Sequence, residues 1–175
     1  HAYTNNQTLG DVYKPEDLSV DDVPKEDLRR SRSAPENIIP ASTHSPVQLD
    51  KVLPHLASRV GGMAVSGAVS EGSVIDLVSF HPKSVTKEHV NAVIKSGAGS
   101  LFPMQVEYCS EPIVSADVRG STASAVFDSL MTGAIADPTN DRDRQTMVKT
   151  LIWYDNGWSF AHRVTDLVSI LAKTL

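Results

Sequence analysis

The chain has 175 residues, of which 41% are hydrophobic and 21% charged, and it carries a formal net charge of -5 with a pI of about 5.6. This size allows one ordinary domain with its own core, and the acidic balance argues against nucleic acid as a partner, because phosphate-backbone binders concentrate lysine and arginine. No apolar run approaches the about 20 residues that a membrane helix needs, so we expect no membrane partner. The single cysteine, Cys109, rules out an internal disulfide and favours a cytoplasmic location.

The first residues, HAYTNNQ, begin on histidine instead of methionine. Three origins fit this start: a removed signal peptide, a copper site made by the amine and imidazole of His1, or a break inside a longer protein. Residues 8–37 are acidic, interrupted by prolines and poor in large apolar side chains, which predicts a long loop. Within it, PEDL (15–18) and PKEDL (24–28) predict two helical turns that begin at proline.

The hydrophobic spacing from Ser45 onward predicts a helix over residues 45–60. We expect Ser45 to be its N-cap, with Pro46 at the first helical position. Two segments rich in β-branched or alternating residues follow at 63–69 and 73–80. They predict two strands in antiparallel contact.

The second half of the chain continues with strands and helices in alternation. TKEHVNAVIKSGAG (86–99) predicts a helix capped by Thr86. Strand candidates are QVEYCSE (105–111), SADV (115–118), TASAVFDS (122–129) and TMVKTLIWYD (146–155), with DPTNDRDRQ (137–145) as an exposed turn and AHRVTDLVSILAKTL (161–175) as a last helix. Together these elements predict an α+β fold with a mixed, mostly antiparallel sheet that carries helices on one face.

Phosphate loops and metal motifs are absent from the sequence. Neither GxGxxG nor GxxxxGK[ST] occurs, and the six histidines form no HExxH or Cys/His pair at zinc spacing, so we expect no metal site. Cys109 has no cationic neighbour in VEYCSEP and is interpreted as a structural residue on a strand.

An arginine cluster is the most suggestive chemical feature. Arg29, Arg30 and Arg32 in DLRRSRS come shortly before the hydroxyl-rich ASTHS. Guanidinium groups with hydroxyls suit an oxyanion or a phosphate. The alternative is a set of ion pairs with nearby acids such as Glu26 and Asp27.

The chain contains, in this order, HAYTNNQ, DLRRSRSAPENIIPAST, GGMAV followed by SVIDL, and WYDNGWSFAHRVTDL. In this order the segments resemble the C-terminal half of phosphorylating glyceraldehyde-3-phosphate dehydrogenases. The resemblance implies that residues 1–175 form a catalytic and oligomerisation domain and that the mixed sheet is preceded by a long S-shaped loop, residues 6–37. It also implies that the NAD-binding Rossmann domain lies outside this chain and that the intact protein is a homotetramer.

The same resemblance implies roles for five residues. His1 matches the general base, Thr4 and Arg30 match substrate-phosphate contacts, and Thr43 matches the threonine that closes the second motif in the phosphate site. Asn156 matches the asparagine that contacts the nicotinamide carboxamide of NAD. The implied reaction is oxidation of a phosphorylated aldehyde through a thioester, with an imidazole whose pKa near neutrality suits proton transfer.

Three positions depart from the family pattern. Ser66 stands where the family has a phosphate-binding arginine, His44 replaces a glycine, and Phe160 replaces a frequent tyrosine. Loss of a charge-assisted contact costs on the order of 1.5–3 kcal/mol, or roughly 10- to 100-fold in affinity. Two functions therefore stay open: part of an aldehyde dehydrogenase, or a non-catalytic relative that serves as a binding or regulatory module.

Overall fold

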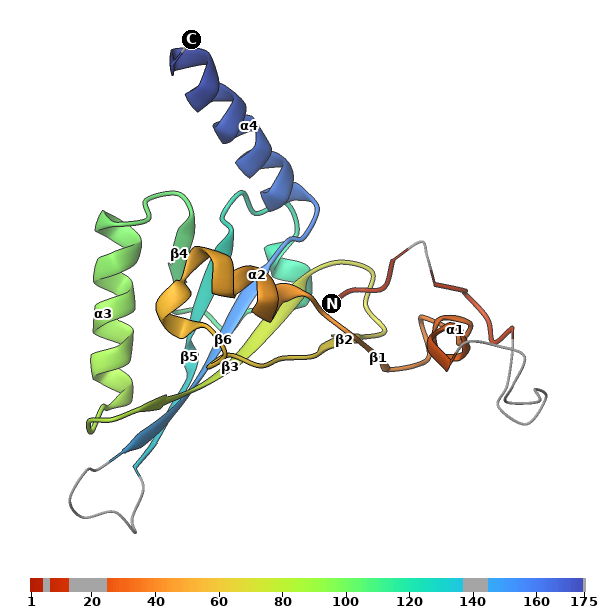
Figure 1. Ribbon diagram of the computed structural model, residues 1–175, viewed down its shortest axis with the longest axis horizontal. Coiled ribbons are helices and arrows are strands. Elements are labelled where there is room, and N and C mark those ends of the chain that lie inside the picture. Colours follow the sequence, from red (N-terminus) through yellow and green to blue (C-terminus); the bar gives the residue numbers. More distant parts are fainter. Residues whose placement is uncertain (5–6, 13–24, 137–144, 175) are drawn as a thin grey trace. The chain divides into compact units, whose positions relative to one another are not determined.

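The computed structural model describes residues 1–4, 7–12, 25–136 and 145–174. The chain divides into two compact units, His1–Ser70 and Glu71–Leu175 (Figure 1). Each unit has its own sheet, and the mixed sheet of the second unit confirms the predicted α+β class.

The first unit is built around a small antiparallel ladder. Strand β1 (Ile39–Ala41) pairs with β2 (Ala64–Ser66), and Ile39 lies opposite Ser66. The other elements of this unit are α1 (Lys25–Arg30), α2 (Ser45–Val52) and the short 3-10 helix η2 (Pro54–Leu56). Helix α1 confirms the second of the two predicted proline-led turns, whereas the first, at 15–18, lies outside the described residues.

The predicted helix over 45–60 was too long at its C-terminal end. Helix α2 stops at Val52, and η2 begins at Pro54, because proline supplies no N–H and clashes with the preceding turn. The predicted cap was also wrong. His44 occupies the N-cap position without a side-chain cap, and Ser45 is the first helical residue.

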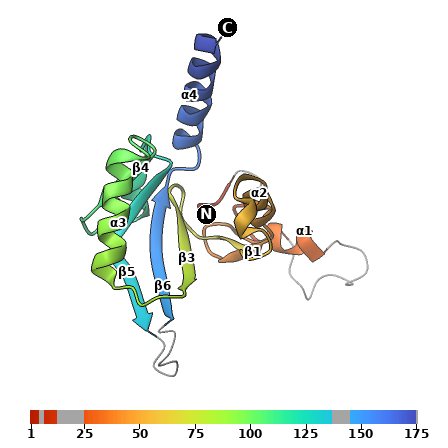
Figure 2. The same ribbon diagram turned by 60° about the vertical axis from the view of Figure 1, so that its left-hand side comes forward.

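The second unit has a four-stranded sheet in the order β3-β6-β5-β4. Strands β3 (Ser73–His81), β6 (Thr146–Tyr154) and β5 (Ala125–Ala136) are antiparallel to their neighbours, and β4 (Val106–Cys109) joins β5 in parallel. Helix α3 (Lys87–Ser100) lies along β4 and β5 (Figure 2). Helix α4 (Trp158–Thr174) follows β6 at the end of the sheet.

Two strand predictions fail in ways that the topology explains. The segments 63–69 and 73–80 do form strands, but they do not pair with each other: β2 pairs with β1, and β3 pairs along its whole length with β6. The more apolar β6 offers β3 a longer ladder than a three-residue strand can. SADV forms a 3-10 helix, η3 (Ser115–Val118), and the predicted turn at 137–145 lies almost entirely outside the described residues.

A bulge in β5 anchors helix α3 to the sheet. The pairing with β6 shifts between Asp128 and Gly133, and the buried Asp128 carboxylate accepts the backbone N–H groups of Leu130 and Met131 inside this bulge. Asn91 of α3 donates to the carbonyl of Ser129 at 3.0 Å. The helix is therefore held by polar contacts at a point where the regular ladder is interrupted.

The apolar core of the second unit lies beside η3. Val118, Ala123 and Val126 are buried together, and Trp153 packs against them. Other apolar side chains stay exposed, namely Val74, Ile75, Leu77 and Val78 on β3 and Val164, Leu167, Val168 and Leu171 on α4. These exposed apolar residues are grouped on two elements and are not scattered singly over the surface.

Candidate functional site

The backbone of His1 is held against strand β2. Its amino group donates to the carbonyl of Val65 at 2.8 Å, and its carbonyl accepts the N–H of Gly67 at 2.8 Å. Because Val65 and Gly67 flank Ser66, these two bonds bring His1 next to the position where the sequence departs most from the resembling family.

Thr4 lies at the start of the loop and is exposed. Its N–H donates to Oε1 of Gln7, and its carbonyl accepts the N–H of Gln7, both at 3.1 Å. The two hydrogen bonds fix the Thr4 backbone through a local turn. Its hydroxyl has no hydrogen bond among the described residues.

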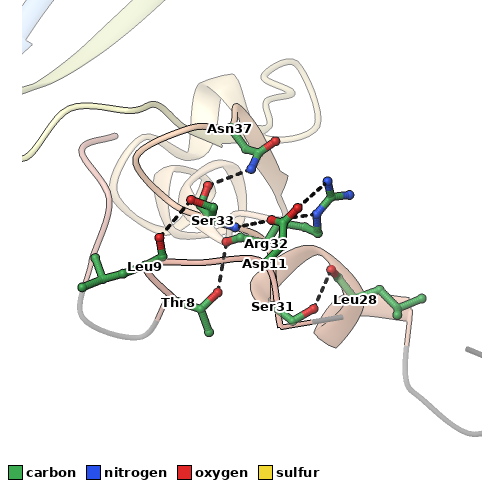
Figure 3. Close-up of polar contacts among 8 residues, drawn as sticks. All are labelled: Thr8, Leu9, Asp11, Leu28, Ser31, Arg32, Ser33 and Asn37. Carbon is green, nitrogen blue, oxygen red and sulfur yellow. Dashed lines mark hydrogen bonds and ion pairs between the residues drawn. The ribbon is translucent and has the colours of Figure 1, made fainter. Parts of the chain in front are cut away.

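The loop segment 8–12 runs beside residues 31–34 and is joined to them by hydrogen bonds (Figure 3). The Thr8 hydroxyl donates to the carbonyl of Arg32 at 3.2 Å, and the N–H of Ala34 donates to the carbonyl of Thr8 at 2.8 Å. Ser33, which is 1% exposed, donates its hydroxyl to the carbonyl of Leu9. Two parts of the predicted loop therefore form one ordered structure.

Asp11 is the centre of this contact, as Figure 3 shows. Its two carboxylate oxygens meet Nε and Nη2 of Arg32, each at 3.0 Å, and Oδ1 also accepts the N–H of Ser33 at 2.7 Å. A guanidinium fork on a carboxylate combines charge with fixed geometry. Arg32 is thus engaged inside the loop, in an ion pair with an acid far from the cluster in sequence.

Arg29 and Arg30 form the last turn of α1 and are both exposed. Within the residues that the structure describes, neither guanidinium forms an ion pair. The side chains of Glu26 and Asp27, the acids suggested by the sequence as partners, lie outside the described residues. Among the described residues, Arg29 and Arg30 thus differ from Arg32, whose guanidinium is paired with Asp11.

Thr43 lies between β1 and α2 and is half-buried. Its hydroxyl oxygen lies 2.9 Å from the Ser45 hydroxyl and accepts the N–H of Ser45 at 3.2 Å. Thr43 thus stands at the start of α2, where backbone N–H groups favour anions. Among the described residues, the side chains of Thr4, Arg30 and Thr43 share no hydrogen bond or ion pair with one another.

Asn156 belongs to the second unit, in the turn between β6 and α4, and is exposed. Its Oδ1 accepts a long hydrogen bond of 3.4 Å from the hydroxyl of Ser73. The neighbouring Asp155 accepts the N–H groups of Gly157 and Trp158, so it caps α4. Burial acts to raise the pKa of Asp155, but three backbone N–H groups and the charge of Arg119 outweigh it and hold that pKa below its usual range.

The sequence patterns did not identify three residues at these sites, namely Asp11, Ser73 and Asp155. Asp155 had a signal, because aspartate shortly before an apolar helical run is typical of an N-cap. Asp11 and Ser73 had none, since their partners Arg32 and Asn156 lie 21 and 83 positions away.

Two features of the described residues bear on other functions. No helix among them is both long and apolar enough to cross a membrane. No group of three or more histidine, cysteine, aspartate or glutamate side chains within the same residues is arranged to hold a metal ion. Cys109 is a half-buried thiol on β4, 3.6 Å from the carbonyl of Glu111.

Comparison with known proteins connects this geometry to one family. A family model described as glyceraldehyde 3-phosphate dehydrogenase, C-terminal domain, matches residues 1–156. A glyceraldehyde-3-phosphate dehydrogenase of Geobacillus stearothermophilus is 38% identical over 173 residues, which are 99% of this chain and 46% of that protein. Glyceraldehyde-3-phosphate dehydrogenase 2 of Streptomyces avermitilis is 37% identical over 175 residues, 100% of this chain and 47% of that protein. The chain spans about half the length of the curated relatives it matches.

Proposed function

The chain belongs to the glyceraldehyde 3-phosphate dehydrogenase family as its C-terminal domain, and from this premise we propose that it is the catalytic part of an NAD-dependent phosphorylating aldehyde dehydrogenase. The substrate class is a phosphorylated aldehyde, oxidised through a thioester. In the family the nucleophilic thiol and the Rossmann domain belong to sequence that precedes a segment of this kind. The observation that carries the proposal is the pair of backbone hydrogen bonds that hold His1 beside Ser66.

His1 acts in this proposal as the general base. Its imidazole takes the proton of the attacking thiol, gives it to the oxygen of the hemithioacetal that forms, and takes it back as the same carbon loses its hydrogen as hydride, which leaves the thioester. An imidazole can accept and return a proton near neutral pH without a large free-energy cost. The fixed backbone of His1 limits where the ring can lie, which favours a constant distance to the reacting atoms.

Thr4, Arg30 and Thr43 bind phosphate groups in this proposal. Arg30 supplies a positive charge, while Thr4 and Thr43 supply hydroxyl groups. Arg32 does not join them, because its guanidinium is paired with Asp11. The missing family arginine at Ser66 therefore leaves Arg30 as the guanidinium that meets the substrate phosphate.

Asn156 has the donor that a nicotinamide carboxamide needs. Its Oδ1 accepts from Ser73, so the two protons on Nδ2 stay available for a carbonyl oxygen. This arrangement fits NAD, and the chemistry that NAD supplies when bound is acceptance of a hydride. Asn156 would orient the nicotinamide, whereas the rest of the cofactor would be bound by the Rossmann domain.

The remaining features of the proposal are assembly and location. The exposed apolar residues of β3 suit burial against a second copy, so we propose a homo-oligomer, a tetramer in the intact protein, with residues 6–37 as an S-loop that reaches a neighbouring subunit. The domain assignment covers residues 1–175, and the location is the cytoplasm. Sedimentation of the isolated chain should show association at high concentration, and a monomer throughout would contradict the proposed assembly.

A non-catalytic binding module is the second candidate, and Ser66 is the observation that favours it. Ser66 is half-buried at the end of β2 and offers a hydroxyl where a guanidinium would bind phosphate. In this case the family fold and its assembly surface would persist while the phosphate site loses its affinity. The natural reading frame upstream of His1 separates the two candidates: a Rossmann segment with a cysteine motif supports the enzyme, and an unrelated domain supports the module.

The decisive experiment uses the longest natural reading frame that contains this chain. We expect NADH formation from glyceraldehyde 3-phosphate, with His1→Asn lowering kcat about 10²- to 10⁴-fold. His55→Asn, at an exposed histidine of η2, is the matched control and should leave kcat unchanged. The 175-residue chain alone should form no NADH. Equal effects of the two substitutions would refute the role of His1.

A further inference from the structure

Three segments of the second unit meet at the turn that carries Asn156, and we call them the collar. They are residues 71–73 at the start of β3, residues 115–120 around η3, and residues 154–157 between β6 and α4. Glu71 forms an ion pair with Arg119, and the N–H of Gly120 donates to Oδ2 of Asp155 at 2.8 Å. The segments are far apart in sequence, so each contact closes a long loop.

The first and second segments touch through their backbones. Gly72 has a φ of +80°, and a Cβ placed there would overlap the backbone of Ser115, only 3.1 Å from its Cα. Glycine is required at this approach, since it both tolerates this φ and lacks the overlapping atom. The start of β3, and with it the adjacent Ser73, is thereby fixed against η3.

The third segment is held by the carboxylate of Asp155. Oδ1 accepts the N–H groups of Gly157 and Trp158 at 3.0 and 2.8 Å, while Oδ2 reaches Gly120. Asn156 lies in sequence between the acceptor, Asp155, and the two donors, Gly157 and Trp158. Its backbone therefore has little freedom to move relative to η3.

The side chain of Asn156 is contacted by the hydroxyl group of Ser73. Ser73, which is 3% exposed, donates to Asn156 Oδ1, and it lies opposite Tyr154 in the pairing of β3 and β6.

We propose that Ser73 and Asp155 are positioning residues that hold the Asn156 amide with Nδ2 turned toward the carboxamide oxygen of the nicotinamide. The proposal rests on the proposed function of Asn156. With Ser73 donating to Oδ1, the Nδ2 end of the amide is left to face the ligand, and Asp155 fixes the backbone that carries the amide. A rotated amide would present its oxygen to another oxygen and would repel the cofactor.

The test measures the Kd for NAD by fluorescence titration, together with the KM for NAD and kcat, in the full-length protein, and the Kd should change in parallel with the KM. Ser73→Ala should raise this KM about three- to tenfold, the effect of one hydrogen bond, with kcat at saturating NAD nearly unchanged. Ser73→Thr keeps a hydroxyl and should restore the KM. Ser79→Ala, which removes a half-buried hydroxyl from the same strand, is the matched control and should leave the KM unchanged.

A double-variant cycle separates positioning from general stability. If Ser73 acts through Asn156, then Ser73→Ala should have no further effect on the KM in an Asn156→Ala background, even if it lowers the melting temperature. An equal rise in both backgrounds would overturn the positioning role. A raised KM in Asn156→Ala with an unchanged KM in Ser73→Ala would refute this inference alone, whereas an unchanged KM in Asn156→Ala would refute the assigned role of Asn156 and the inference with it.

Discussion

Two glycines with nearly the same backbone conformation should differ sharply when each is replaced by alanine. Gly72 has a φ of +80° and Gly120 a φ of +73°. An added Cβ in this left-handed conformation destabilises the folded state by about 1–2 kcal/mol at either position. At Gly120 nothing lies within 4 Å of that Cβ, whereas at Gly72 it overlaps the backbone of Ser115. The shifts needed to remove this overlap add about 1–3 kcal/mol to the destabilisation caused by Gly72→Ala. We expect losses of about 2–5 kcal/mol for Gly72→Ala and about 1–2 kcal/mol for Gly120→Ala.

Equilibrium urea unfolding measures these free energies, and Gly97→Ala provides a control of opposite sign. Gly97 lies in α3 with open space around its Cβ, so alanine there should stabilise the protein by about 0.5–1 kcal/mol. The expected order of stability is Gly97→Ala, then the unsubstituted protein, then Gly120→Ala, and last Gly72→Ala. If Gly72→Ala unfolds no more easily than Gly120→Ala, the close approach that fixes the collar does not exist.

Three further expectations concern charges. Asp11→Asn should cost about 1–2 kcal/mol in urea unfolding, because the arginine fork and a backbone N–H lose a charged acceptor, while Asp76→Asn, in an ion pair about half exposed, should cost at most about 0.5 kcal/mol. The pKa of Asp155 is depressed in the folded state, so the stability difference from Asp155→Asn should be full near pH 7 and shrink as pH falls through that pKa; a constant difference to pH 3 would contradict the cap. Ser66→Arg should lower the KM for a phosphorylated aldehyde roughly 10- to 100-fold but leave that for an unphosphorylated one unchanged.

Local patterns in the sequence predicted the elements well where periodicity was strong. The helix over 86–99 and the last helix were found because their apolar spacing and caps are local signals, and Thr86 accepts the N–H of His89 as a cap should. The short strand Ile39–Ala41 was missed because Pro40 at its centre argues against a strand. An edge strand of three residues tolerates that proline.

Pairing between strands was not readable from the sequence. Proximity along the chain suggested that 63–69 would pair with 73–80, yet β3 found its partner in β6, with Ser73 opposite Tyr154. A ladder of that length satisfies far more backbone groups than the adjacent short strand offers. The number of backbone hydrogen bonds over the whole ladder decides which strands pair, and a short stretch of sequence does not reveal that number.

The candidate site also contains residues that local motifs identify and residues that only long-range contacts reveal. The motifs named His1, Thr4, Arg30, Thr43 and Asn156, because a motif records residue types at fixed spacing. The acidic partner of Arg32 was sought among its neighbours in sequence, but it is Asp11, which loop geometry brings across. Ser73 was likewise invisible, since nothing in its own segment indicates contact with Asn156.

The two units use the same device to hold the segments that carry these residues. In the first, Asp11 accepts the N–H of Ser33, and in the second, Asp155 accepts the N–H of Gly120, each bond bridging more than 20 positions of sequence. Both segments contain few apolar side chains, so packing alone would leave them loosely held. A charged acceptor on backbone N–H groups gives roughly twice the strength of a neutral hydrogen bond and a defined direction. The positions of residues 31–34 and of Asn156 therefore depend on two aspartates that the sequence motifs do not include.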